Sequence, residues 1–195
     1  MFVVPRPRGF QTEAVVDAAI EQFRSSSYAA TSTDDLCACT GLSRSSLYNA
    51  FGNKAAMYRA ALQRYDETGR ARSECLLDAD GRGRDLVEHM LRDTIAVQRA
   101  AADRRTCMVL AASVEVGSND PQVAELARQN LDGYHATLTK LIERGQADGS
   151  ITTAVCAADL ATMLHAVING LQIVGRVSVD DETVDRTIDT ALSLL

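Results

Sequence analysis

Apolar residues recur along most of the chain at intervals of three and four positions, the spacing that places side chains on one face of an α-helix. Between residues 11 and 25 one face is apolar and the other is charged; the predicted apolar stripe is Ala14, Val15, Ala18, Ala19 and Phe23. No segment of the sequence shows the strict alternation of apolar and polar residues that is typical of a half-buried strand. The pattern therefore predicts an all-α fold.

Turn and capping residues divide the chain into about nine helices. Breaks such as Asp80-Gly81-Arg82-Gly83 separate them, and Asp120-Pro121 supplies a cap and a first-turn proline for the longest. The predicted helices cover residues 11–25, 33–39, 44–51, 54–78, 84–102, 106–116, 121–148, 157–175 and 181–195. We expect an N-terminal three-helix domain over residues 1–53 and a larger C-terminal helical domain over residues 54–195.

The helix over residues 157–175 is apolar nearly all round, so it must be covered on two sides. Its apolar residues are Leu160, Met163, Leu164, Val167, Ile168, Leu171, Ile173 and Val174. Together with the last helix it offers more apolar surface than one small bundle needs, which indicates a subunit interface. The sequence therefore predicts a symmetric homodimer.

The segment from Thr33 to Phe51 predicts two short helices joined by a tight turn. Ser32 and Asp35 form a capping-box pattern before the first helix, Ser43 can cap the second, and Gly41 suits a turn that needs a positive φ. This spacing is typical of a helix-turn-helix unit, whose second helix enters the major groove of DNA. A helical hairpin with a solvated polar face is the alternative.

The second short helix has an exposed face of polar residues that can read DNA. Leu47 and Phe51 face inward, whereas Arg44 can pair with guanine, Asn49 can pair with adenine, and hydroxyl groups can bind bases or phosphates. Just beyond this helix, Lys54 can bind a phosphate. The polar face consists of Arg44, Ser45, Ser46, Tyr48 and Asn49.

The same segment carries a family resemblance. The run Ser27-Tyr28-Ala29-Ala30-Thr31-Ser32 is followed by Gly41-Leu42-Ser43-Arg44-Ser45-Ser46-Leu47-Tyr48-Asn49-Ala50-Phe51-Gly52-Asn53-Lys54. With these runs, residues 10–65 resemble the DNA-binding domain of the TetR family of bacterial transcriptional repressors. The resemblance implies that Thr33, Tyr48 and Lys54 contact phosphates and that Arg44, Ser45, Ser46 and Asn49 lie where bases are read. It also implies a homodimer on a double-stranded DNA operator and a C-terminal domain that binds a small-molecule inducer.

Three positions depart from the family pattern. Ser27 replaces the usual glycine of the turn, and Ala50 replaces a frequent histidine. The third is Asp34, an aspartate at a position that faces DNA in some members of the family. A carboxylate at position 34 lowers affinity for phosphates unless it accepts a hydrogen bond from a cytosine amine or from an arginine. The operator sequence therefore stays open.

Composition and charge narrow the function classes. The chain of 195 residues carries a net charge of −6 and five cysteines. Residues 1–72 hold nine Lys or Arg against seven Asp or Glu, whereas the rest hold eleven against nineteen, and local cations decide affinity for phosphates. The cysteines are scattered, and the three histidines lack metal-ligand spacing, so we expect no disulfide framework, metal or cofactor. Without an apolar run of membrane-span length or a secretion signal, we expect a cytoplasmic protein that does not enter membranes.

Cys107 is a candidate redox sensor. The run Thr106-Cys107-Met108-Val109-Leu110 resembles the start of the sixth helix in a TetR subgroup that includes sensors of reactive electrophiles. Its place near a helix start, after Arg104 and Arg105, gives two reasons for a lowered thiol pKa. We hypothesise that oxidation or alkylation of Cys107 releases DNA; a small buried cysteine that only packs in the core is the alternative.

A ligand pocket is expected among the fourth to eighth helices, with mainly apolar walls. The candidate residues are Met90, Cys107, Met108, Tyr134, His135, Met163 and His165.

The sequence offers no nucleophile elbow and no phosphate-binding glycine loop, so we assign no catalytic residue and expect no enzyme. The sequence predicts a DNA-binding transcriptional regulator, a repressor released from a near-palindromic operator by a ligand or by thiol modification. The alternatives are a helical interaction module or activator and a helical-bundle enzyme.

Overall fold

A computed structural model describes residues 8–100, 107–177 and 180–195, with side chains from residue 12 onward. Within these ranges the chain forms nine helices and no strand, which confirms the all-α prediction. The helices are α1 (Arg8–Ser26), α2 (Thr33–Thr40), α3 (Arg44–Phe51), α4 (Lys54–Asp78), α5 (Gly83–Arg99), α6 (Met108–Glu115), α7 (Pro121–Ala147), α8 (Ala157–Val177) and α9 (Asp181–Leu192). Arg104 and Arg105, which precede Cys107, lie outside the described residues.

Two details of the sequence prediction are wrong. In α1 the buried stripe includes Val16 and Ile20, which the prediction missed, whereas Ala14 is exposed, because the buried face follows positions 16, 19, 20 and 23. Helix α6 begins at Met108, so Cys107 stands at its N-cap and not inside it. The predicted ends of the other helices lie within a few residues of the observed ones.

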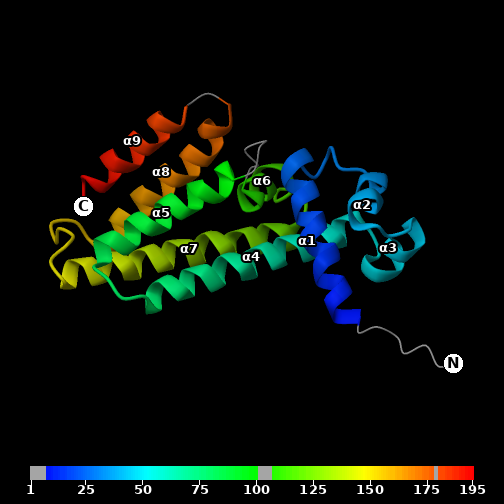
Figure 1. Cartoon of the computed structure of the whole chain (residues 1–195), viewed down its shortest axis with the longest axis horizontal. Helices are drawn as coiled ribbons and strands as arrows, with labels where there is room; N and C mark the ends of the chain where they lie inside the picture. The colour runs from blue at the N-terminus through cyan, green and yellow to red at the C-terminus, as the bar shows by residue number, and fades with distance from the viewer. Residues whose placement is uncertain (1–7, 101–106, 178–179) are drawn as a thin grey trace.

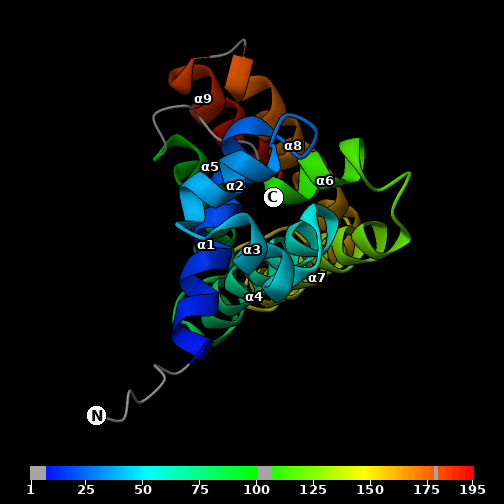
Figure 2. The same cartoon turned by 90° about the vertical axis from the view of Figure 1, so that its right-hand side faces the viewer.

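The helices form an elongated bundle (Figure 1). Helices α4 and α7 pack against each other along the long axis, and α1, α2 and α3 lie at one end. Helix α5 packs between α7 and α8, while α9 covers α8 and α5. Helix α6 contacts α1, α4 and α7, so it lies where the two ends of the molecule meet (Figures 1 and 2).

The buried side chains fall into two clusters. The head cluster joins α1, α2, α3 and the first half of α4 to α6 and the start of α7; it includes Leu36, Leu47, Met57, Tyr58, Met108, Val109, Ala112 and Val123. The body cluster joins α5, the second half of α7, α8 and α9; it includes Leu91, Leu141, Leu164, Ile168 and Val184. The domain boundary at residues 53 and 54 stays a prediction, and the buried residues of α4 nearest to it pack with the helices that precede it.

Helices α5 and α7 approach each other closely at a pair of glycines. A Cβ atom at Gly83 would lie 2.1 Å from the backbone nitrogen of Gly145 and 2.6 Å from the carbonyl oxygen of Leu141. The backbone N–H of Gly83 also donates to the carboxylate of Asp148 at 2.7 Å. The absence of a side chain at Gly83 thus lets α5 begin directly on the surface of α7.

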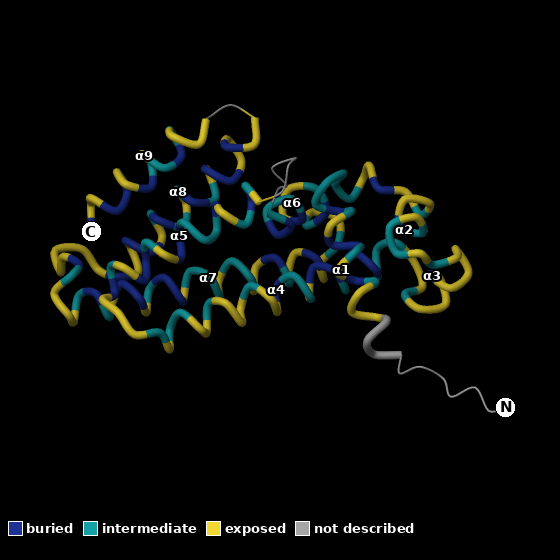
Figure 3. The backbone as a smooth tube through the Cα atoms, in the orientation of Figure 1, coloured by how far each residue is buried: buried dark blue, intermediate teal, exposed yellow. Residues whose placement is uncertain are grey.

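Helix α8 combines a buried face with an exposed apolar face (Figure 3). Leu164 and Ile168 are buried in the body cluster, while Ile173 is 53% and Val177 is 81% exposed. Among the described helices only α8 has the length and hydropathy of a membrane span, and a core helix of a soluble protein passes the same test. Its contacts with α5, α7 and α9 show that one face of α8 packs inside the bundle.

Candidate functional site

Local hydrogen bonds set the geometry of α2 and α3. The Ser32 hydroxyl accepts from the backbone N–H of Asp35 at 3.1 Å, and the Asp35 carboxylate accepts from the backbone N–H of Ser32 at 2.8 Å. The hydrogen bonds from Ser32 hold the pKa of Asp35 below its ordinary value. Gly41 ends α2 at φ +70°, and Ser43 caps α3 through the backbone N–H of Ser46. The predicted capping box, turn and second cap are therefore present.

Helix α3 buries one residue and exposes most of the others (Figure 3). Leu47 is fully buried and anchors α3 in the head cluster. The predicted base-reading and phosphate residues of this helix are all exposed: Arg44, Ser45, Ser46, Tyr48 and Asn49. Thr33, in the first turn of α2, is half-buried. A short helix with one anchored face and one polar face, at the end of an elongated molecule, can enter a DNA groove.

Asp34 of α2 and Arg44 of α3 form an ion pair across the turn. The guanidinium Nη2 lies 2.7 Å from Oδ1 of Asp34, and the two side chains are 60% and 78% exposed. This hydrogen bond raises the pKa of Arg44 above its ordinary value. The carboxylate that departs from the family pattern thus accepts a hydrogen bond from an arginine, one of the two partners considered for it above. The pair also leaves other N–H groups of Arg44 open.

Lys54 supports the turn between α1 and α2. Its ammonium donates to the carbonyl oxygens of Tyr28 at 3.0 Å and of Thr31 at 2.9 Å, and it lies 4.3 Å from the centre of the Tyr28 ring. An ammonium has three N–H donors, so one remains for a phosphate. The phosphate contact stays a prediction, and the structural role of Lys54 was not foreseen.

Glu115, the last residue of α6, holds the same turn from the other side. Its carboxylate accepts from the backbone N–H of Tyr28 at 3.0 Å and of Ala29 at 2.6 Å. Ser27 in this turn has φ +68°, the only positive φ among the described non-glycine residues, and a left-handed conformation costs a residue with a Cβ roughly 1 kcal/mol. The position that is usually glycine in the family is therefore a strained one here, and it is held from α4 and from α6.

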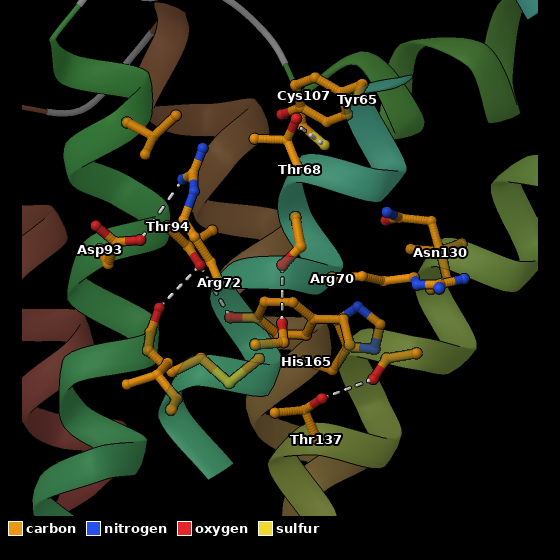
Figure 4. A pocket seen from close by; sticks show the side chains of 18 of the residues that line it. Tyr65, Thr68, Arg70, Arg72, Asp93, Thr94, Cys107, Asn130, Thr137 and His165 are labelled. Carbon is orange, nitrogen blue, oxygen red and sulfur yellow. Dashed lines mark hydrogen bonds and ion pairs between the residues drawn. The ribbon is translucent and has the colours of Figure 1, made fainter. Parts of the chain in front are cut away.

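A cavity of about 470 Å³ lies among α4, α5, α7 and α8, and the start of α6 closes one part of its wall. Four of the predicted pocket residues line it: Met90, Cys107, Tyr134 and His165. Figure 4 labels Cys107 and His165. The other three do not. Met108 is buried in the head cluster, Met163 packs against the body cluster, and His135 bonds the Ala158 carbonyl and the Thr162 hydroxyl.

An aromatic pair lies in the cavity wall. The rings of Tyr134 and His165 stack with centres 5.0 Å apart. Thr94 donates to the Met90 carbonyl at 2.8 Å, so the Tyr134 hydroxyl donates to the Thr94 oxygen at 3.1 Å. Burial raises the pKa of Tyr134 and lowers the pKa of His165, with the nearby His135 adding to the second shift. Both side chains are therefore uncharged at neutral pH.

The Cys107 thiol points to the Tyr65 hydroxyl, with sulfur and oxygen 3.9 Å apart (Figure 4). Burial raises the pKa of Tyr65, so the phenol stays protonated and can donate to the sulfur. Cys107 is half-buried and lines the cavity. A molecule in the cavity therefore has access to this thiol.

Two family models match separate parts of the chain. Residues 15–61 match the bacterial regulatory proteins of the tetR family, and residues 83–195 match the C-terminal domain of the BetI-type transcriptional repressors. The first range covers the helix-turn-helix, and the second covers α5 to α9.

Individual relatives agree with this assignment. The chain is 28% identical to the HTH-type transcriptional repressor ComR of Escherichia coli, over 97% of this chain and 90% of ComR. It is 31% identical to the repressor BdcR of the same organism, over 71% of this chain and 67% of BdcR. Among solved structures, a cysteine mutant of the TetR family regulator CifR, complexed with 26-bp double-strand operator DNA, matches with a TM-score of 0.82 and 26% identity, over 96% of this chain and 98% of CifR. The chain belongs to the TetR family of bacterial regulatory proteins.

Proposed function

We propose that the protein is a cytoplasmic, homodimeric repressor that binds a near-palindromic operator and is released by a small molecule in the cavity among α4, α5, α7 and α8. It acts by binding and not by catalysis. The observation that carries the proposal is α3, a short helix anchored by Leu47 that presents Arg44, Tyr48 and Asn49 to solvent. The solved structure of CifR with operator DNA supports the same use of the fold.

The dimer sets the distance between two such helices. The exposed apolar residues of α8 and the C-terminal end, Ile173, Val177 and Leu194, form the surface that the partner subunit covers. Two copies of α3 must lie about 34 to 36 Å apart to enter successive major grooves on one side of the DNA. A ligand that favours another separation weakens DNA binding by its difference in affinity for the two arrangements.

Helix α6 connects the cavity to the DNA-binding end. Its N-cap, Cys107, and its first-turn residue Leu110 line the cavity, whereas Glu115 at its other end holds the turn that leads into α2. The two ends are about 12 Å apart at the usual rise of a helix. A ligand that displaces the start of α6 therefore moves the carboxylate that positions the helix-turn-helix.

Selection of bound duplexes from a random DNA pool tests the proposal. We expect recovery of one near-palindrome with half-sites about one helical turn apart. Recovery of no enriched sequence contradicts sequence-specific regulation and favours the interaction-module alternative. Repeating the selection after alkylation tests the thiol alternative, which predicts loss of the palindrome in the native protein and its retention in Cys107→Ser.

The variant Glu115→Gln tests the connection through α6. We expect it to bind the selected operator several-fold more weakly, because each charge-assisted hydrogen bond contributes about 1.5 to 3 kcal/mol when buried and less at this half-exposed site. Electrostatics alone predicts the opposite result, since the substitution removes a negative charge from a protein that binds phosphates. Fluorescence anisotropy with labelled operator measures the change.

Glu143→Gln is the matched control, because Glu143 is an exposed α7 residue whose side chain makes no ion pair or hydrogen bond with another described residue. We expect operator affinity to be unchanged or slightly raised in this variant. If Glu115→Gln behaves in the same way as the control, Glu115 does not position the helix-turn-helix.

A further inference from the structure

The charged residues around the cavity either lie at its exposed edge or are paired. Arg70, Glu74 and Lys140 are exposed to solvent. Arg72 pairs with Asp93 at 3.6 Å, and Arg24 pairs with Glu21 at 3.2 Å. These charges therefore face water or an opposite charge, and none of them requires a charged ligand.

The buried part of the wall holds one charged side chain, Arg24, which is 9% exposed and pairs with Glu21, and several polar side chains that carry no charge. Gln98 of α5 and Gln172 of α8 line the cavity with only 7% and 6% of their surface exposed. The Gln98 amide nitrogen donates to the Gln172 backbone carbonyl at 2.7 Å, which places the two residues side by side. The Gln98 side-chain oxygen and the whole Gln172 carboxamide have no hydrogen-bond partner among the described residues.

These free amide atoms meet open space and are not sealed in the core. Among the described side chains, no fully enclosed nitrogen or oxygen lacks a hydrogen-bond partner. Because both residues line the cavity, a molecule bound there lies beside them. Two buried carboxamides beside one cavity together offer donors and acceptors, and a molecule that leaves them unpaired binds poorly.

The rest of the wall fits a flat apolar body. The stacked rings of Tyr134 and His165 form one side, and His165 is neutral because burial lowers its pKa. Aliphatic side chains supply much of the remaining surface: Leu76, Leu77, Met90, Val97 and Leu110. The volume of about 470 Å³ is in the range of sites for drug-sized molecules.

We infer that the cavity binds an uncharged organic molecule with a flat apolar body and a neutral head group that both donates and accepts hydrogen bonds, such as a carboxamide, held by Gln98 and Gln172. An ionised head group is disfavoured there, because burying a charge without an opposite charge is expensive. The inference rests on the proposed function and names the chemical class of its ligand.

Three naphthalene derivatives that differ only in the head group test this inference on the intact dimer: 2-naphthamide, 2-naphthoate and 2-(aminomethyl)naphthalene, which is cationic. We expect calorimetry and thermal shift to detect binding of the amide and at least tenfold weaker binding of both ions. In Gln172→Leu we expect the amide to bind about tenfold more weakly, the effect of one lost hydrogen-bonding partner. In Gln172→Glu we expect the preference to move toward the amine.

Lys140→Gln is the matched control, because it changes an exposed residue at the edge of the cavity and should leave amide binding unchanged. The inference is overturned if naphthoate binds best and depends on Lys140 or Arg70, if amide binding does not depend on Gln172, or if none of the three compounds binds.

A gel-shift assay with the selected operator separates this inference from the proposed function. Operator binding without amide binding leaves the proposed regulator intact and overturns the ligand class. Amide binding that depends on Gln172 but does not release operator supports the ligand class and contradicts release by a ligand in the cavity.

Discussion

Replacing Gly83 with alanine should lower the free energy of unfolding by about 3 kcal/mol, the upper end of the usual cost of overpacking. The new Cβ atom would lie 2.1 Å from the nitrogen and 2.4 Å from the Cα atom of Gly145, and 2.6 Å from the Leu141 carbonyl oxygen. All three are backbone atoms, so no change of rotamer relieves the clash. Helix α5 must instead move away from α7 and weaken the hydrogen bond from Gly83 to Asp148.

Gly133→Ala is the matched control for this prediction, because a Cβ atom at Gly133 meets nothing within 4 Å in the middle of α7. Alanine in a helix interior is more favourable than glycine by about 1 kcal/mol, so this variant should be slightly stabilised. Urea unfolding followed by circular dichroism, at one fixed protein concentration because the dimer contributes to stability, measures both variants. Equal stabilities for the two variants would show that α5 and α7 do not meet as described.

The second large effect is expected at Arg44. Arg44→Ala should weaken binding to the selected operator by about 1 to 3 kcal/mol, roughly 5- to 150-fold, and relax the base preference at one position of each half-site. The guanidinium is exposed at the first position of α3, where it can reach the O6 and N7 atoms of guanine. Titrations against the operator and against single-base variants measure both effects. An unchanged base preference would show that the placement of α3 in the major groove is wrong.

The variant Asp34→Ala tests two expected effects of the Asp34 carboxylate: it repels phosphates, and it positions the guanidinium of Arg44. Loss of the carboxylate should raise affinity for every sequence, since a negative charge near phosphates is removed. It should also reduce discrimination at the base that Arg44 reads, because the guanidinium is no longer held at 2.7 Å from Asp34. A double-mutant cycle with Arg44→Ala measures the coupling of the two residues, and a coupling of zero contradicts the positioning role of Asp34.

The sequence was most informative where structure is local. The Ser32 and Asp35 capping box, the left-handed Gly41 and the inward Leu47 each depend on residues a few positions away in the sequence, so local spacing predicts them. The exposed face of α3 follows from the same spacing. The predicted end of α5 and the predicted start of α6 differ from the observed ones, because no strong capping signal stands at either point in the sequence.

Contacts between distant segments could not be predicted from spacing. Glu115 meets the turn at Tyr28 across 87 residues, and nothing near Glu115 in the sequence distinguishes it from other helical glutamates. The residues that line the cavity could not be predicted from spacing either. Met90 and Tyr134 line it and Met163 does not, although all three are half-buried or buried residues of amphipathic helices. Which face of a helix meets a cavity depends on how the helices cross, and that is a property of the assembled bundle.

Because α6 packs in the head cluster together with α1, α2 and α3, the N-terminal segment cannot easily be exchanged for that of a relative. Met108, Val109 and Ala112 of α6 are buried in the same cluster as side chains of α1, α2 and α3. A chimera joined at residue 53 would set these three side chains against the core of a foreign DNA-binding domain, and it would separate Glu115 from the turn that it holds. New DNA specificities therefore arise more readily by point substitution on the exposed face of α3 than by exchange of the whole N-terminal segment, unless the matching α6 is exchanged with it.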